Sequence, residues 1–397
     1  MRGSVKKRGA GYSVIIELER DPVTGKRRQK WHSGYPTKRA AERALAEMVN
    51  SVHSGTFVEL TNETVGEYLA QWLTAIEPTI RPATHYSYSR NIRLHVVPRL
   101  GSVPLRRVDG GMLNALYAEL LASGKRSNGG GGLSPRTVRY IHTILHRAFK
   151  DAVRWGRLAR NPADAADPPR ASADNRPAMT TWTAEQVRIF LNYIAKHRLY
   201  AAFVLLVTTG MRRGEALGLR WTDLDLVAGR ASVVQTVIVV NHQVRIGSPK
   251  TAAGRRTVAL DPFTVTVLRE HRHRQLAERL LMGAGFTDHG LVFCRPDGAP
   301  LHPERFSRTF SEQAAKAGLP PIRLHDLRHT WATLALTAGV HPRVAQERMG
   351  HSTVGITLGT YSHVTEGMQD TAAALVAQLM TQPVSNPLAA GGRSDQD

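Results

Sequence analysis

Apolar residues recur at steps of three and four along residues 64–160, and Pro or Gly interrupts the pattern between successive segments. This spacing is typical of helices that bury one face against a core. It predicts four helices, at 64–77, 81–100, 108–123 and 134–156. We therefore expect a domain resembling a four-helix bundle at 64–160, in which the polar, Gly-rich run at 127–132 connects the third helix to the fourth.

The N-terminal residues follow a different pattern. Residues 12–19 and 26–33 favour strands and flank a turn, and an amphipathic helix follows at 37–54, opened by a Thr cap. Together they predict a compact sheet-plus-helix domain at 1–57. The polar residues that separate it from the helical domain are predicted to be a linker.

Residues 161–179 are rich in Pro, Ala and Asp and show no periodicity, which predicts a linker between domains. Beyond them come three helical segments, three strand-like segments and one more helical segment: 183–197, 199–210, 211–221, 230–240, 242–249, 255–260 and 262–281. They predict a third domain of α+β type at 180–380, closed by a helix at 366–380, and a disordered tail at 381–397. The expected fold class is multidomain and mainly α, with small β-sheets.

A formal net charge of +21 over 397 residues indicates the kind of partner. Lys and Arg occur along the whole chain, so a polyanion is expected, with nucleic acid favoured over an anionic membrane. No apolar run approaches the ~18 residues that span a bilayer, and the first residues lack the apolar stretch of a signal peptide. We expect a cytoplasmic protein without a membrane partner. The single cysteine, Cys294, excludes an internal disulfide and is predicted to be a small core residue.

The residues suited to chemistry concentrate in two stretches. Residues 208–221 read Thr-Thr-Gly-Met-Arg-Arg-Gly-Glu and onward, and residues 325–364 contain His-Asp-Leu-Arg-His, then Gly-His, then a tyrosine. His325 and Arg328 are three residues apart, so they share about one face of a helix. His351 and Tyr361 follow on the next segment. Such a set could surround a phosphodiester and attack it.

By residue type and spacing, these stretches resemble the active-site boxes of the tyrosine recombinase (phage integrase) family. The family's Thr-Gly-x-Arg box selects Arg212 over Arg213 and implies that Glu215 supports it. The resemblance also implies a catalytic lysine in the hairpin Ser-Pro-Lys-Thr, where the matching residue is Lys250. Without the resemblance, Arg212 and Glu215 are more typical of a surface ion pair, and a hairpin lysine of a solvent-facing side chain.

The resemblance implies a set of six catalytic residues: Arg212, Lys250, His325, Arg328, His351 and Tyr361. In this set Tyr361 is the nucleophile and Lys250 protonates the departing 5′ oxygen. His325 helps to accept the tyrosine proton, and His351 hydrogen-bonds the scissile phosphate.

Physical chemistry explains why such residue types are needed. Tyrosine titrates near pH 10, so about one in a thousand is ionised at pH 7, a deficit of roughly 4 kcal/mol. Guanidinium forks can donate paired hydrogen bonds to the phosphate oxygens that gather charge. A positioned acid contributes about 10²–10⁴-fold when a poor leaving group departs.

Two further domains resemble DNA-binding parts of the same family. Residues 3–45 resemble its arm-type domain, and residues 64–160 its core-binding domain, which forms half of a clamp around the crossover site. The side chains expected to contact DNA are Arg27, Arg28, Lys30, Trp31, Arg81, Thr84, Arg90, Arg136 and Arg139. The residue patterns alone leave open a solvated edge strand and an ordinary wet helix face.

A metal site is an alternative for the second stretch, because His325 and His329 have the i, i+4 spacing of a zinc helix. However, Asp326 replaces the Glu that serves as base in such helices, Arg328 adds a cation, and no third ligand can be assigned. We expect no metal. The chain also lacks a Gly-rich phosphate loop, and a covalent phosphotyrosine conserves bond energy, so no cofactor is expected.

The expected function is site-specific DNA recombination that integrates and excises a phage or mobile plasmid at attachment sites. The expected partners are double-stranded DNA, at core and arm sites, and further copies of the chain in a tetrameric synapse. A host DNA-bending protein and an excision factor are candidate partners. The alternatives are a chromosome-dimer resolvase of the same family, which would lack the N-terminal domain, a catalytically silent DNA-binding regulator, and a type IB topoisomerase.

Overall fold

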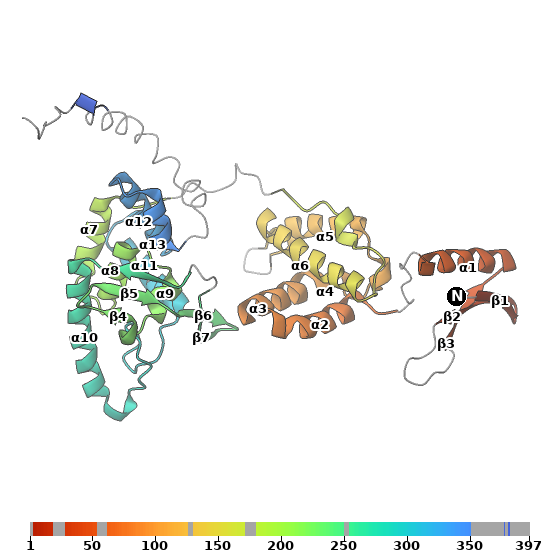
Figure 1. The fold of residues 1–397 in the computed structure, drawn as a ribbon, viewed down its shortest axis with the longest axis horizontal. Helices are drawn as coiled ribbons and strands as arrows, with labels where there is room; N and C mark the ends of the chain where they lie inside the picture. Colours follow the sequence, from red (N-terminus) through yellow and green to blue (C-terminus); the bar gives the residue numbers. More distant parts are fainter. Residues whose placement is uncertain are drawn as a thin grey trace, which may run out of the picture. The chain divides into compact units, whose positions relative to one another are not determined.

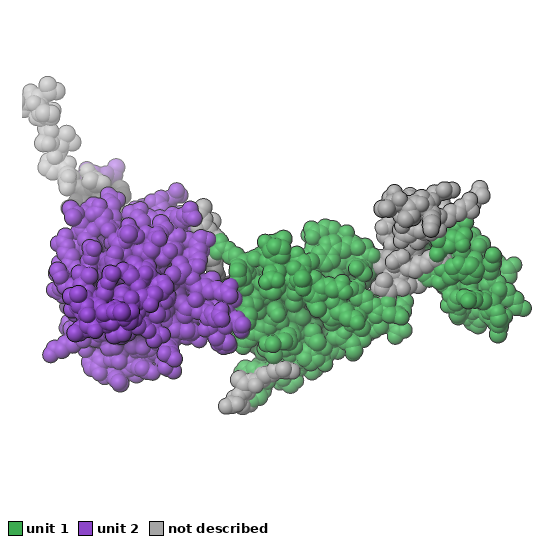
Figure 2. All heavy atoms as spheres, turned by 90° about the horizontal axis from the view of Figure 1, so that it is seen from below, with its two compact units in different colours: residues 1–176 green, residues 177–397 purple. Residues whose placement is uncertain are grey.

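A computed structural model describes the chain at residues 3–18, 28–53, 62–125, 130–170, 180–249 and 254–350, with residues 377, 380 and 381. The chain divides into two compact units, residues 1–176 and 177–397, coloured green and purple in Figure 2. Within the described residues, no helix combines the length and the apolar character needed to cross a membrane. The expected closing helix at 366–380 and the tail fall almost wholly outside these ranges.

The N-terminal part is an antiparallel sheet in the order β1-β2-β3 with one helix packed on it (Figure 1). Its elements are β1 (Gly3–Arg8), β2 (Gly11–Leu18), β3 (Arg28–Tyr35) and α1 (Lys38–His53). Val14 and Ile16 alternate inward from β2 and pack with Ala41 of α1. The sequence predicted only two strands. The first one, β1, was missed because it is an exposed strand whose single apolar residue gives no alternation.

The described residues of 62–125 and 130–170 form mainly helices around a second hydrophobic core. The helices are α2 (Val65–Ile76), α3 (Pro82–Asn91), α4 (Val97–Leu100), α5 (Gly110–Ser123) and α6 (Pro135–Arg154). One π-helical turn, Ile92–Val96, joins α3 to α4, so the two form the single long helical segment that periodicity predicted. Trp72 of α2 donates its indole N–H to the buried Asp151 of α6 at 2.8 Å, which fixes these two helices against each other.

The second unit is built around the buried helix α8, whose neighbours include α9, α10 and α12 (Figure 1). The helices are α7 (Ala184–Tyr193), α8 (Tyr200–Thr209), α9 (Arg213–Gly218), α10 (Pro262–Met282), α11 (Pro303–Lys316), α12 (Asp326–Thr337) and α13 (Pro342–Met349). Phe203 of α8 packs against Phe306 and Phe310 of α11, a helix that the sequence analysis did not predict. The predicted fold class, mainly helical with small sheets, is confirmed.

The strands described in this unit form two small sheets. One has the order β4-β5-β8 and the other is the hairpin β6-β7: β4 (Leu224–Asp225), β5 (Arg230–Val233), β6 (Thr236–Val240), β7 (Gln243–Gly247) and β8 (Arg256–Ala259). The sequence predicted one continuous strand at 230–240. The structure interrupts it at residues 234 and 235, where the chain passes from one sheet to the other. Gln235 fixes this crossing by donating to the carbonyl of Gly218 at 2.8 Å.

Candidate active site

The turn between α8 and α9 sets the position of Arg212. Gly210 ends α8 in the left-handed conformation, with φ of 64°, and a Cβ there would lie 2.9 Å from the ring of Trp331. The turn therefore requires glycine both for its φ and for the close approach of α12. Met211 is buried directly after it. Arg212 thus begins α9 from a fixed point, with 41% of its side chain exposed.

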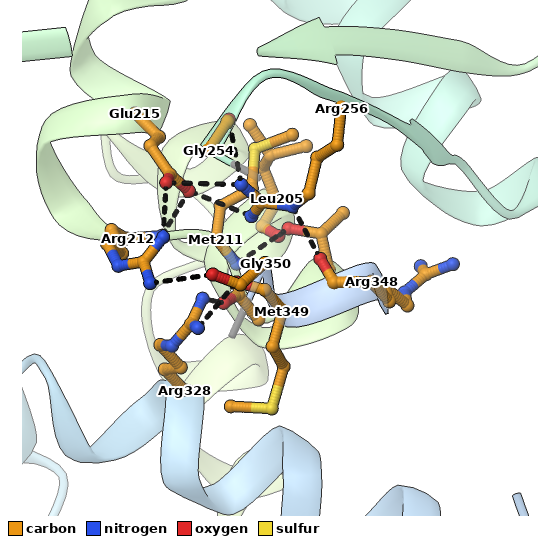
Figure 3. Close-up of polar contacts among 12 residues, drawn as sticks. Leu205, Met211, Arg212, Glu215, Gly254, Arg256, Arg328, Arg348, Met349 and Gly350 are labelled. Carbon is orange, nitrogen blue, oxygen red and sulfur yellow. Dashed lines mark hydrogen bonds and ion pairs between the residues drawn. The ribbon is translucent and has the colours of Figure 1, made fainter. Parts of the chain in front are cut away.

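Glu215, one turn into α9, is a buried carboxylate held between two arginines (Figure 3). Its two oxygens accept from Arg212 Nη1 at 2.8 Å and from Arg256 Nη1 and Nη2 at 3.1 and 2.9 Å. The backbone N–H of Arg212 also donates to Glu215, at 2.9 Å. Burial by itself raises the pKa of this carboxyl, but the hydrogen bonds and charges of Arg256 and Arg212 outweigh it and lower the pKa. Glu215 is therefore ionised at neutral pH.

Three guanidinium groups converge on the C-terminal end of α13 (Figure 3). Arg256 Nε donates to the carbonyl of Arg348 at 2.7 Å, Arg328 Nη2 to that of Met349 at 2.5 Å, and Arg212 Nη2 to that of Gly350 at 3.1 Å. These consecutive carbonyls belong to a helix end, where acceptors lack helical partners and the helix dipole is negative. The contacts fix the backbone that leads directly into residue 351.

Arg328 links this helix end to the turn after α8. It is only 3% exposed, and its Nη1 donates to the carbonyl oxygen of Gly210 at 2.7 Å. Arg213, the neighbour of Arg212, points elsewhere: its Nη1 donates to the carbonyl of Pro303 at 3.1 Å and to Ser307 Oγ at 2.6 Å, both on α11. Of the two adjacent arginines, only Arg212 contacts the end of α13, in agreement with the family's spacing.

His325 stands at the start of α12, with its ring edge-on to that of His329 at a centroid distance of 5.2 Å. Desolvation, followed by the charges of His329 and Arg328, lowers the pKa of His325 to about 4. The residue nevertheless keeps solvent access. Its imidazole is therefore neutral at pH 7 and can accept a proton.

Asp326 has a structural role in the same motif. Its carboxylate accepts from the backbone N–H of Arg323 at 2.8 Å and from the guanidinium of Arg323 at 2.8 and 3.1 Å. Among the residues that the structure describes, no group of three His, Cys, Asp or Glu side chains could hold a metal ion. The Asp326 carboxylate is thus engaged by Arg323.

The remaining predicted catalytic residues, Lys250, His351 and Tyr361, lie outside the described residues, as does Arg27. From the predicted set, the structure brings together Arg212, Glu215 and Arg328, and it places His325 at the start of the helix that carries Arg328. It does not test the roles given to any of them.

The predicted DNA contacts of the helical domain lie on two neighbouring helices. Ser87 of α3 and Tyr140 of α6 are hydrogen-bonded at 3.2 Å, so these helices lie side by side. The exposed arginines predicted to contact DNA border this pair: Arg81, Arg90, Arg136 and Arg139. Thr84 is half-buried on α3. The arrangement is compatible with one basic face, while DNA contact by these side chains stays a prediction.

Of the contacts predicted in the N-terminal sheet, the structure describes the side chain of Trp31. Trp31 is paired with Ile15 and is 44% exposed, and Lys6 of β1 extends over its ring at 5.9 Å from the centroid. The side chains of Arg28 and Lys30 lie outside the description, although their backbone belongs to β3. The exposed Lys6 was absent from the predicted contacts because β1 itself was not recognised.

Arg256 is the residue of this site that the sequence analysis missed. It follows the stretch containing Lys250, and the resemblance directed attention to the lysine. The signal was strand alternation, since Arg256 shares a face of β8 with the buried Val258. An arginine on the inner face of a strand demands a buried partner, here Glu215.

Three family models match the chain. The model described as the phage integrase family matches residues 180–368, the arm DNA-binding domain matches residues 4–52, and the N-terminal SAM-like domain of phage integrases matches residues 64–109. Between them they account for most of the chain and fall on both compact units.

Curated relatives share this organisation over most of their length. A protein from Caldanaerobacter subterraneus named "Tyrosine recombinase XerC-like" is 28% identical over 370 residues, covering 89% of this chain and 92% of the relative. The ICEBs1 integrase of Bacillus subtilis is 25% identical over 365 residues, covering 91% and 95%. The integrase of Mycobacterium phage D29 is 27% identical over 292 residues, covering 73% and 72%.

Solved structures show the same fold. The Tn1549 transposon integrase, in complex with a circular intermediate DNA, matches with a TM-score of 0.64 at 24% identity, covering 80% of this chain and 99% of that chain. A lambda integrase tetramer bound to a Holliday junction matches with a TM-score of 0.56 at 18% identity, covering 90% and 94%.

Proposed function

The chain belongs to the phage integrase family of tyrosine recombinases, and we propose that it integrates and excises a phage or mobile plasmid at defined attachment sites. It is a tyrosine-type recombinase that acts on DNA. The match to an arm DNA-binding domain at residues 4–52 supports the finer proposal, because a chromosome-dimer resolvase is expected to lack that domain. Double-stranded DNA at core and arm sites is the proposed substrate, in the cytoplasm of a bacterial host.

The observation that carries the proposal is the convergence of Arg212 and Arg328 on the carbonyls of Gly350 and Met349. These carbonyls directly precede His351 and stand about ten residues before Tyr361 in the sequence. The Arg212 guanidinium, with 41% of its side chain exposed, has further N–H groups beyond those that donate to Glu215 and Gly350. Two cations fixed beside the backbone that carries the nucleophile suit a reaction in which a phosphate gains negative charge.

In the proposed cleavage step, the phenolic oxygen of Tyr361 attacks the scissile phosphorus. A bond forms between this oxygen and phosphorus, giving a 3′-phosphotyrosine, and the bond from phosphorus to the 5′ oxygen breaks. Lys250 gives a proton to the departing 5′ oxygen, and His325 accepts the proton of the tyrosine. His351 hydrogen-bonds the phosphate. The reverse step, with the 5′ hydroxyl of a partner strand as nucleophile, rejoins the DNA.

The protonation state of His325 bears on its part in this step. A neutral imidazole at pH 7 has a free lone pair for the tyrosine proton. Desolvation is the main cause of its low pKa, and the charges of His329 and Arg328 add to it.

Recombination between two sites requires four cleaving subunits, and we propose a homotetramer in the synapse. The lambda integrase structure supports this, since it is a tetramer bound to a Holliday junction. A host DNA-bending protein and an excision factor are proposed further partners, because the arm domain provides a second set of DNA contacts that bent DNA could bring to the core.

A covalent-adduct assay tests the proposal. A nicked suicide substrate, from which the 5′ product diffuses away, should trap wild-type protein as a DNA adduct that survives denaturation. Tyr361→Phe should give no adduct while binding DNA with unchanged affinity, because only the nucleophilic oxygen is lost. An adduct with the variant would refute the assignment of Tyr361. Binding without any adduct in the wild type would favour the silent regulator.

A further inference from the structure

Arg256 contacts the candidate active site at two places, Glu215 and the end of α13, although no sequence motif pointed to it. Its Nη1 and Nη2 donate to both oxygens of Glu215, at 3.1 and 2.9 Å, and its Nε donates to the carbonyl of Arg348 at 2.7 Å. Only 8% of its side chain is exposed. Each of its three guanidinium nitrogens already donates to an acceptor within the protein.

The contacts join two parts of the site that carry different functional groups. Glu215 orients the Arg212 guanidinium, and the carbonyl of Arg348 lies at the end of α13, two residues before Gly350. Arg212 in turn donates to Gly350. Arg256 therefore closes a ring of hydrogen bonds that runs through Glu215 and Arg212 to the α13 end and back (Figure 3).

We infer that Arg256 is a positioning residue for DNA cleavage: it fixes the Arg212 guanidinium, through Glu215, against the helix end that leads to His351. The inference rests on the proposed function. The physical basis is that the buried Glu215 carboxylate shares its two oxygens between Arg212 and Arg256. If Arg256 is lost, both oxygens are left to Arg212 alone, which changes the orientation of its guanidinium. Without Arg256, Arg212 would be drawn toward Glu215 and away from a phosphate.

Lysine is the informative replacement, because it keeps the positive charge but cannot span a carboxylate and a carbonyl with a planar fork. Arg256→Lys is expected to lower the single-turnover rate of adduct formation by about tenfold or more, as small misplacements of a catalytic group do. The dissociation constant for a core half-site is expected to stay within about twofold, because Arg256 is buried. An unchanged cleavage rate, or equal losses in rate and affinity, would overturn the inference.

Arg198 provides a matched control in the same unit. It donates to both oxygens of Glu278, at 2.8 and 2.7 Å, and to the carbonyl of Cys294 at 2.7 Å, so it forms the same kind of bridge away from the site. Arg198→Lys is expected to leave the cleavage rate within about twofold of wild type. A rate loss equal to that of Arg256→Lys would mean that any such bridge serves general stability, and would also overturn the inference.

A double-mutant cycle separates positioning from an independent contribution. If Arg256 acts through Arg212, adding Arg256→Lys to Arg212→Lys lowers the rate by less than about twofold beyond Arg212→Lys alone. Multiplied losses would refute action through Arg212.

Two further controls keep the test decisive. If Arg256→Lys does not fold, the double variant Arg256→Gln/Glu215→Gln replaces it, because that variant removes both buried charges. Its cleavage rate is then compared with the rate of Glu215→Gln alone. An absent wild-type adduct would instead refute the proposed function, which distinguishes the two failures.

Discussion

Arg328 donates a hydrogen bond of 2.7 Å to the carbonyl oxygen of Gly210, 118 residues earlier in the chain. The bond joins the turn that presents Arg212 to the helix that presents His325. Because Arg328 also donates to Met349, one buried guanidinium fixes both parts relative to the end of α13. The backbone at Gly210 is therefore part of the active-site framework.

Gly210→Ala is expected to destabilise the protein and to slow cleavage. An alanine in the left-handed region costs about 1 kcal/mol, and strained sites range up to about 3 kcal/mol. The new Cβ would also lie 2.9 Å from the ring of Trp331, which is too close and would displace α12. Gly318→Ala is the matched control, since Gly318 has φ of 69° but nothing within 4 Å of its Cβ position. Denaturant unfolding should show the larger loss for Gly210→Ala, and equal losses would contradict a role for the Trp331 contact.

Lys250→Ala is expected to lose cleavage on ordinary DNA and to recover it on a substrate with a 5′-bridging sulfur. A thiolate leaves without a proton, so the general acid is no longer needed. His351→Ala removes a phosphate contact instead and should not be rescued. Single-turnover cleavage of both substrates measures the difference. Equal rescue of the two variants would remove the assignment of Lys250 as the acid.

The pKa of His325 predicts an acid-sensitive contribution to stability. A folded-state pKa of about 4 lies below the ordinary value of 6.5, so the unfolded chain binds more protons between these pH values. The contribution of His325 to the free energy of unfolding is therefore complete above pH 6.5 and decreases as the pH falls toward 4. Unfolding titrations of His325→Asn should show a shallower loss over this window. NMR titration of the wild type with a midpoint near 6.5 would contradict the prediction.

Two side chains of the N-terminal sheet should affect arm-site binding in different ways. Lys6→Ala is expected to lower the slope of log affinity against log salt by about one, because one phosphate contact is lost. Trp31→Ala removes an exposed aromatic surface and should weaken binding with little change in slope. Filter binding to arm-site DNA measures both, with core-site DNA as the control. Parallel weakening on core DNA would argue against a separate arm-binding surface.

Truncation after Val364 is expected to spare binding to one half-site and to impair tetramer assembly and recombination. The removed residues include the apolar positions Leu375, Val376 and Leu379, which an isolated short helix cannot bury. Gel-shift stoichiometry on full sites, together with recombination yield, measures the effect. A tetramer that forms unchanged would indicate that this segment packs within its own subunit.

The sequence by itself determined the features that depend on neighbouring residues. Periodicity located most helices, because a helix that buries one face repeats its apolar residues every three or four positions. The family's Thr-Gly-x-Arg spacing selected Arg212 as a candidate, and the left-handed Gly210 and the start of α9 beside it are both local features. The family and its fold class could be predicted for the same reason.

Packing between distant segments decided the rest. The strand β1 acquires its structure by pairing with β2. A guanidinium can donate to many different acceptors. The spacing of residues along the sequence therefore does not show that Arg256 donates to Glu215, or that Arg328 donates to Gly210 and Met349. These hydrogen bonds form only when α9, β8, α12 and α13 pack together. Burial then removes water as a competing hydrogen-bond partner, so each charged group must bond to the protein acceptors beside it.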